Sequence, residues 1–482
     1  MAAVFGAIVG SFLNVVIFRL PNEMSVTKPA WSFCPHCKKR IRPYHNLPVI
    51  GWLWLRGRCY DCRTPISIVY PLIECATALL FVMIWDAMFV GRVLPGIQQP
   101  GQDWPMAIAY LALFAGLLAT SAMDIESYTI DIRLSVFTMI LGVLCHAVWG
   151  MPSKAVALTE TASAAASEKY QTLDLLPSSM CVIGIAMGAA WFLTVLIGTA
   201  LLKSKQGDLD ADHTENGKMQ EEPDTGATAY LESANQRFRP LVIMTFAAVI
   251  LGLVIWQLSA PKQTSHWRLE TGEVRGLVAC VVIMLLLIFV SLVRRESDDQ
   301  IVEEIESERD EARPMALREI AWFLPAILVG GGLLIYFQST QKLNAGFTEL
   351  LGRTATAPNW IEHVEAASQA VAAMVFAAAL GWTVRILGTL AFGKEAFGTG
   401  DIYIMAAIAS VMGFWSVFFT FFLATILALV GVLATLFRKS SRAIPFGPWL
   451  SLGAFVNLWL LGPLLDYYEP TAQILWSILT EP

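Results

Sequence analysis

Charged residues are scarce in this chain. Asp, Glu, Lys and Arg together make up 15% of its 482 residues, hydrophobic residues make up 56%, and the mean hydropathy is +0.58. Because a soluble domain carries about 25% charged residues, this composition excludes an ordinary soluble globular protein. It indicates an all-α, polytopic membrane protein that works in a lipid bilayer.

Several chemical signatures are also missing. The sequence has no basic stripe and no aromatic platform of the kind that binds nucleic acid, so we expect no nucleic-acid partner. It offers no Ser/His/Asp set, no HExxH and no Walker loop. Residues 1–18 are apolar but lack a preceding basic segment and a following small-residue cleavage site, which predicts a retained first span and not a cleaved signal peptide. This run is short enough for the natural start to lie upstream of it.

Long apolar runs dominate what is present. Runs of about 17–25 apolar residues are typical of membrane-spanning helices. They lie at 2–18, 71–90, 106–123, 134–150, 180–202, 239–258, 276–293, 320–337, 367–390, 415–437 and 448–465. A shorter run, 402–413, either crosses with help from its neighbours or enters only partway; counting it gives about 12 spans.

The distribution of Lys and Arg orients the chain. These residues cluster in four loops, among them the loop that follows span 2–18. Positive residues concentrate on the cytoplasmic side, and with about 12 crossings all four loops fall there. Asp124 ends an inward-running span and Asp401 begins an outward-running one. This topology therefore places both acids at the cytoplasmic end of the bilayer.

Asp401 closes the sequence Phe397-Gly398-Thr399-Gly400-Asp401. Gly398 and Gly400 carry no side chains, so a substrate backbone could approach Asp401 closely. The structural alternative is that Asp caps a helix and Gly terminates one. A second acid in a similar setting, Asp124, favours a functional role for Asp401 over a helix cap. Ionisable groups in membrane helices are costly, and they usually have a function.

Two facing carboxyl groups would suit peptide hydrolysis. Asp124 and Asp401 could not both ionise cheaply if they faced each other, so they would share a proton. The ionised Asp would take a proton from water, while the protonated one would polarise the scissile carbonyl. Glu126 and Asp131 compete with Asp124 in sequence, but we interpret both as solvated loop charges because Asp124 adjoins the apolar span.

A four-cysteine cluster lies in the loop after the first span. Cys34 and Cys37 form one CxxC pair, and Cys59 and Cys62 form a second. Two such pairs can place four thiolates around one Zn²⁺. Disulfides are the alternative, but thiols stay reduced in the cytoplasm, where this loop is predicted to lie. Because four ligands close the site, we expect a structural zinc that folds the loop.

These motifs resemble those of the bacterial type IV prepilin leader peptidases, which are membrane aspartic proteases of the GxGD kind. In chain order the resemblance rests on Gly10–Pro21, Cys34/Cys37 with Cys59/Cys62, Tyr70–Glu74, Asp124, Gly398–Asp401 and Pro445–Pro448. The chain departs from the family at Asp131, where a Pro is usual, and at Tyr403, where a Lys is usual. We expect these departures to affect substrate preference more than chemistry.

The resemblance implies an endopeptidase of the bacterial cytoplasmic (inner) membrane, with Asp124 and Asp401 as catalytic residues. Its substrates would be type IV prepilin or pseudopilin precursors, cleaved between a basic leader and an apolar helix. Several family members also methylate the new N-terminus with S-adenosylmethionine, and the four-cysteine loop accompanies that activity. The sequence itself shows no separate site for the methyl donor.

The resemblance also organises the chain. The family core has about eight spans, and four further spans here lie between residues 180 and 337. We therefore divide the chain into the first span (1–20), a zinc loop (21–70), spans with the first catalytic Asp (71–150), an insertion (151–366) and a core with the GxGD (367–482). Since the motifs lie outside 180–337, we expect those spans to be peripheral to catalysis.

Two other classes of protein stay open. One is a non-catalytic membrane assembly factor of a pilus or type II secretion system, with the zinc loop as a docking module. The other is a transporter, because paired intramembrane acids also serve proton relays.

Overall fold

The computed structural model describes residues 1–90, 94, 97, 99–127, 130–150, 178–209, 309–340, 360–435 and 445–459. Across these residues the chain is helical and contains no β-strand beyond two isolated bridges, which confirms the all-α prediction. The regular elements are α1 (Ala2–Arg19), the 3₁₀ turn η1 (Pro43–His45), α2 (Ile50–Trp54), α3 (Val69–Trp85), the π turn η2 (Asp86–Val90), α4 (Trp104–Ser127), α5 (Ile132–Trp149), α8 (Ser178–Leu209), α12 (Arg309–Ser339), α14 (Trp360–Phe392), α15 (Thr399–Met412) and α16 (Phe414–Thr435). Residues 447–459 form a further helical segment.

Eight of these helices are long and apolar enough to cross a membrane, which makes the chain a multi-pass membrane protein. They are α1, α3 with η2, α4, α5, α8, α12, α14 and α16. Each coincides with an apolar run predicted from the sequence. The predicted spans 239–258 and 276–293 lie outside the described residues, so the total of about 12 spans stays a prediction.

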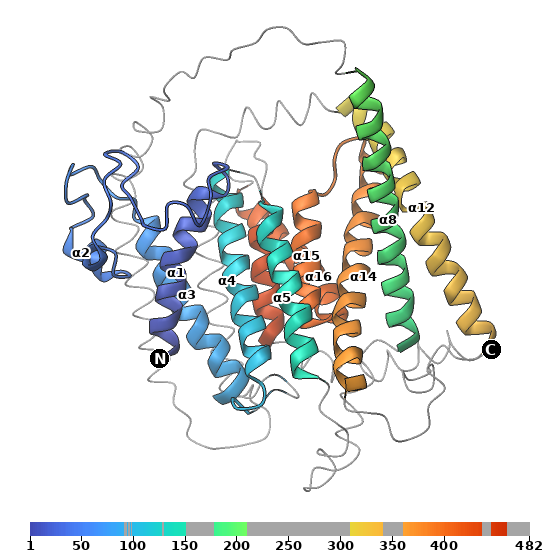
Figure 1. Ribbon diagram of the computed structural model, residues 1–482, viewed down its shortest axis with the longest axis horizontal. Helices are drawn as coiled ribbons and strands as arrows, with labels where there is room; N and C mark the ends of the chain where they lie inside the picture. Colours follow the sequence, from blue (N-terminus) through green and yellow to red (C-terminus); the bar gives the residue numbers. More distant parts are fainter. Residues whose placement is uncertain are drawn as a thin grey trace, which may run out of the picture.

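The helices differ in how deeply they lie in the bundle. In α4, 72% of the most apolar window is buried, whereas in α8 and α12 the share is 17% each. Figure 1 shows α8 and α12 together at one side of the bundle, next to α14, with α1 and α3 at the opposite side. Helix α4 is therefore central, and within the part of the chain that the structure describes few residues of α8 and α12 are buried.

Small residues let α1 and α3 approach each other closely. A Cβ atom at Gly6 would lie 2.8 Å from the Cα of Ala78, and one at Gly10 would lie 2.8 Å from the Cα of Glu74. Gly6 and Gly10 are one helical turn apart, the spacing at which small residues drive helix association in membranes. This contact fixes α3 against α1 and so anchors both ends of the loop that carries the cysteines.

Helix α15 is short and sits inside the bundle. Its 14 residues extend about 21 Å, less than the roughly 30 Å of a hydrocarbon core. Ten of the 14 residues are buried, and α4, α5, α14 and α16 pack around the helix. Gly413, with φ of +86°, ends α15 and leads directly into α16. From Asp401 onward α15 is therefore largely surrounded by protein, whereas its first residue, Thr399, is exposed.

Candidate active site and metal centre

Asp124 lies near the C-terminal end of α4 and is 5% exposed. Its Oδ2 accepts a hydrogen bond from the backbone N–H of Gly447 at 3.1 Å. Gly447 begins the helical segment 447–459, so the positive end of a helix dipole faces this carboxyl group. A Cβ atom at position 447 would lie 2.7 Å from the same oxygen. The hydrogen bond therefore requires a glycine here.

Asp401 lies in the first turn of α15 and is 7% exposed. The N-cap of this helix is Gly398, so Asp401 is not the helix cap that the structural alternative requires. Among the residues that the structure describes, Oδ1 of Asp401 has no hydrogen-bond partner although it is buried. A buried polar atom of this kind is costly to maintain, and a functional role would explain its presence.

The fold brings the two carboxyl groups together. Helices α4 and α15 pack against each other, and Asp401 lies near enough to Asp124 for the two carboxyl groups to interact. Ile130 packs beside both Gly400, which precedes Asp401, and Gly447, which binds Asp124. A Cβ atom at Gly400 would lie 2.7 Å from the Cβ of Ile130, and one at Gly447 would lie 3.5 Å from its Cδ1. Both acids thus lie at the same end of the bundle.

The two glycines before Asp401 have close neighbours within the chain itself. A Cβ atom at Gly398 would lie 3.1 Å from Oδ2 of Asp401, while the space at Gly400 is taken by Ile130. The packing alone thus gives both positions a reason to be glycine. The predicted role of Gly398 and Gly400 in leaving room for a substrate stays a prediction.

Side chains from the Pro445–Pro448 region complete this end of the bundle. The ring of Phe446 lies 5.6 Å from that of Phe397, and Phe421 lies 6.0 Å from Phe397, all in edge-on arrangements. The hydroxyls of Ser121 and Ser451 lie 2.8 Å apart and join α4 to the helical segment 447–459. The sequence singled out this motif only by resemblance, and its contact with Asp124 becomes visible only in the fold.

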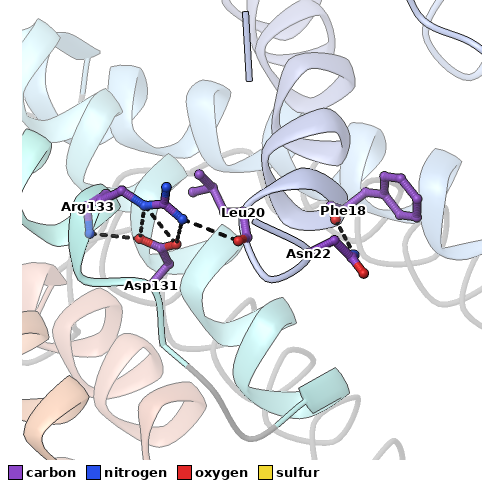
Figure 2. Close-up of polar contacts among 5 residues, drawn as sticks. All are labelled: Phe18, Leu20, Asn22, Asp131 and Arg133. Atoms are coloured by element: carbon purple, nitrogen blue, oxygen red, sulfur yellow. Dashed lines mark hydrogen bonds and ion pairs between the residues drawn. The ribbon is translucent and has the colours of Figure 1, made fainter. Parts of the chain in front are cut away.

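Asp131 has a structural role of its own. Its carboxylate caps α5 by accepting the backbone N–H of Arg133 at 2.8 Å, and it pairs with the Arg133 guanidinium at 2.6 Å (Figure 2). This ion pair holds the pKa of Asp131 below its usual value. Arg133 also donates to the carbonyl of Leu20 at 3.3 Å. Asp131 is thus a helix cap and ion-pair partner, not the freely solvated charge that the sequence predicts. The side chain of Glu126 lies outside the described residues.

The four cysteines of the loop lie together. The sulfurs of Cys34, Cys37, Cys59 and Cys62 are all within 4.8 Å of one another, and all four thiols are free. The Sγ atoms of Cys34 and Cys62 lie 3.8 Å apart. A tetrahedron whose centre lies about 2.3 Å from each sulfur has edges of about 3.8 Å. The cluster therefore has the composition and the dimensions to bind one metal ion.

The two CxxC pairs form the same turn twice. The backbone N–H of Cys34 donates to the carbonyl of Lys39 at 3.0 Å, and that of Cys59 donates to the carbonyl of Thr64 at 2.8 Å. The residue after each pair adopts the left-handed conformation, with φ of +58° and +61°. This repetition points both pairs of thiols at a common centre.

The thiols differ in their surroundings. Thr64 Oγ1 lies 3.2 Å from the Sγ of Cys62, and this hydrogen bond lowers the pKa of Cys62 to about 6. Burial raises the pKa of Cys34 to about 12. A bound cation would favour the thiolate at every one of the four positions.

Two buried polar residues that the sequence did not single out support this loop. Arg19 is 4% exposed and donates from Nη1 to three backbone carbonyls at the start of the loop, each at 3.0 Å. Glu74 is 8% exposed and accepts the N–H of Val49 at 2.7 Å. Val49 has φ of +62°, which a β-branched residue rarely adopts. Both residues fall inside quoted motifs, but only the fold shows what they bind.

Comparisons with known proteins agree with the motifs. Residues 4–88 match the family model described as Bacterial Peptidase A24 N-terminal domain. The chain is 38% identical over 144 residues to the "Type 4 prepilin-like proteins leader peptide-processing enzyme" of Escherichia coli, covering 26% of this chain and 48% of that protein. It is 35% identical over 140 residues to the "Prepilin leader peptidase/N-methyltransferase" of Myxococcus xanthus, and 34% identical over 172 residues to the protein of the same name from Aeromonas hydrophila.

The alignments with these two proteins cover 29% and 31% of this chain, and 38% and 55% of the relatives. The chain thus spans about half the length of the curated relatives it matches, or less. No solved structure matches it. The matches bear out the resemblance to type IV prepilin peptidases that the motifs indicate.

Proposed function

We propose that this chain is a membrane aspartic endopeptidase in which Asp124 and Asp401 act as a pair. The observation that carries the proposal is the placement of two buried carboxyl groups on the packed helices α4 and α15, at one end of the bundle. General acid–base hydrolysis of a peptide needs one ionised and one protonated carboxyl group at the same site.

The surroundings of the two acids suggest how the roles divide. Oδ2 of Asp124 accepts the N–H of Gly447 at a helix start, an arrangement that stabilises negative charge. Oδ1 of Asp401 has no donor among the described residues, so Asp401 is the better carrier of the shared proton. In this assignment Asp124 accepts a proton from the attacking water, and Asp401 donates to the carbonyl oxygen of the scissile bond.

The proposed substrates are prepilin-like precursors, because the curated relatives carry that substrate in their names. The Lys and Arg distribution would place both acids at the cytoplasmic side of the inner membrane. A precursor with a basic leader and an apolar helix would then present its cleavage site at the depth of Asp124 and Asp401. Attraction between the acidic site and the leader would reach about 8 Å at physiological salt.

The proposed metal is one structural Zn²⁺ held by Cys34, Cys37, Cys59 and Cys62. Four thiolates at tetrahedral spacing fit zinc better than a hard cation, which prefers oxygen ligands. Since four protein ligands leave no open position, the ion would fold the loop and take no part in hydrolysis. The carboxyl groups of Asp124 and Asp401 lie in other elements of the chain.

We include methylation of the new N-terminus in the proposal only because relatives carry N-methyltransferase in their names. S-adenosylmethionine would supply the methyl group. We assign no site for this molecule among the described residues, so no step through it is derived.

The direct test is cleavage of a purified prepilin-like precursor by the purified protein in proteoliposomes. The wild type should separate leader from helix, and Asp124→Asn or Asp401→Asn should not. Normal cleavage by both variants would exclude an aspartic peptidase and favour the assembly factor. A wild type that cleaves nothing but moves protons across the vesicle membrane would favour the transporter.

A further inference from the structure

A buried arginine holds the turn that leads into Asp401. Arg385 lies on α14, and 5% of its side chain is exposed. Its Nη1 donates to the carbonyl oxygen of Phe397 at 2.7 Å. Phe397 is followed by Gly398, the N-cap of α15. The guanidinium group therefore fixes the backbone four residues before Asp401.

The charge of Arg385 is balanced from two directions. Glu395, in the turn itself, accepts a hydrogen bond from Nη1. Glu319, on α12, accepts from Nε at 3.1 Å. A buried guanidinium without paired acids is strongly destabilising. The Arg385 side chain is therefore held in the orientation in which both glutamates accept its hydrogen bonds. Arg385 thus links α12 to the turn before Asp401.

Further contacts hold α12 against this region. Phe323 of α12 lies 5.0 Å from Trp382, and the guanidinium of Arg385 lies 5.6 Å from the same indole ring. Near the start of α12, Arg313 would be 3.4 Å from a Cβ atom placed at Gly393, in the turn after α14. Helix α12 therefore touches the supports of the turn at several points along its length.

We propose that Arg385 and Glu319 are positioning residues for Asp401, so that α12 is part of the support of the active site. This inference rests on the proposed peptidase function. The sequence predicts that spans 180–337 are peripheral to catalysis, and Glu319 with most of α12 lies inside that range. Loss of the Glu319 contact would free Arg385 to turn away from Phe397 and would loosen the turn that sets the position of Asp401.

The test compares Glu319→Gln, Arg385→Gln and the double variant with a control, Arg318→Gln. Arg318 neighbours Glu319 on α12 but is exposed. Misplacement of a reacting group by about 1 Å costs up to about 100-fold, so each single variant should lower kcat for precursor cleavage by about 10- to 100-fold. KM should stay within about twofold, because a positioning residue acts on the reacting group and not on the binding of the precursor. The double variant should be no worse than the more affected single one, and the control should match the wild type.

Hydrogen exchange provides a readout that does not depend on activity. In Glu319→Gln protein of wild-type yield in the membrane, the amides of residues 393–401 should exchange faster than in the wild type, and in Arg318→Gln they should not. Wild-type kcat with wild-type exchange in Glu319→Gln would overturn the inference, as would a change in KM alone. If the wild type itself fails to cleave, the proposed function is wrong, and the exchange comparison still supports or overturns the contact.

Discussion

Replacing Asp124 or Asp401 by Asn keeps the size of the side chain and removes its charge. Because general acid–base groups contribute about 10²- to 10⁴-fold, either change should reduce precursor cleavage by at least about 100-fold. The double variant should be scarcely worse, since residues that act as a unit are not additive. The measurement is the cleavage rate in proteoliposomes.

Neighbouring acids provide the controls for that experiment. Glu126→Gln and Asp131→Asn should retain most activity, and zinc content should be unchanged in all of these variants. An active Asp124→Asn protein beside an inactive Asp131→Asn protein would show that the first catalytic residue is misassigned.

Gly447 offers a second test at the level of one residue. A Cβ atom there would lie 2.7 Å from Oδ2 of Asp124, so Gly447→Ala should displace that carboxyl group. Displacement by about 1 Å should lower cleavage by roughly 100-fold. Gly331→Ala on α12 is the matched control, because nothing lies within 4 Å of its Cβ position. Equal activity in the two variants would contradict a role for the Gly447 contact.

The zinc site is tested by metal analysis. We expect about one Zn²⁺ per chain in the wild type and much less in Cys59→Ser, because three thiolates hold the ion less well than four. Cys75→Ser, outside the cluster, should keep its zinc. Cleavage should fall less than any methylation activity, since the carboxyl groups lie in other elements. Equal zinc in wild type and Cys59→Ser would remove these ligands from consideration.

Which residues the sequence reveals depends on how local their signal is. The four cysteines and Asp401 stand in short patterns whose spacing carries the chemistry. Gly447 and Asp124, in contrast, are 323 residues apart, and no local sequence pattern around either residue predicts their contact. Arg385 resembles any other basic residue near a span end until its three partners are placed around it.

The elements follow apolar runs closely because a lipid environment demands helices of a certain length. The apolar runs do not reveal how deeply each helix is buried in the bundle. Run 402–413 leaves open whether it crosses or enters partway; the structure shows that α15 packs among four other helices, and whether it crosses stays a prediction. Burial of a short helix depends on its neighbours, which no local pattern encodes.

The start of α5 provides a prediction at the level of an element. Asp131→Ala removes the N-cap and the ion pair with Arg133 and should destabilise the protein by about 1 kcal/mol, while Asp131→Asn keeps a capping side chain. Because the ion pair lowers the pKa of Asp131, its stabilising effect is complete above the unfolded value of about 3.9. That effect is lost as the pH falls through the lower folded value.

The difference in thermal unfolding midpoint between wild type and Asp131→Ala should therefore be largest near neutral pH and shrink in strong acid. A difference that grows as the pH falls would contradict the assigned ion pair.

At the scale of the whole molecule, the inserted spans make two kinds of contact with the rest of the bundle: apolar packing, and the polar contact of Glu319 with Arg385. Few residues of α8 and α12 are buried among the described residues, so lipid can take over most of their apolar contacts with the bundle at little cost. The contact of Glu319 with Arg385 is different, because lipid cannot replace a carboxylate. Removing the spans should thus spare the bundle and damage one support of Asp401.

Joining residue 179 to residue 338 tests both parts of this argument. The excision removes four predicted spans, so the crossing direction of everything after it is preserved. The shortened chain should insert, bind zinc and cleave at the level of Glu319→Gln, about 10- to 100-fold below the wild type. Wild-type activity would show that α12 does not position Asp401. A chain that inserts and binds zinc but falls far below Glu319→Gln would show that the insertion contributes more to catalysis than this single contact.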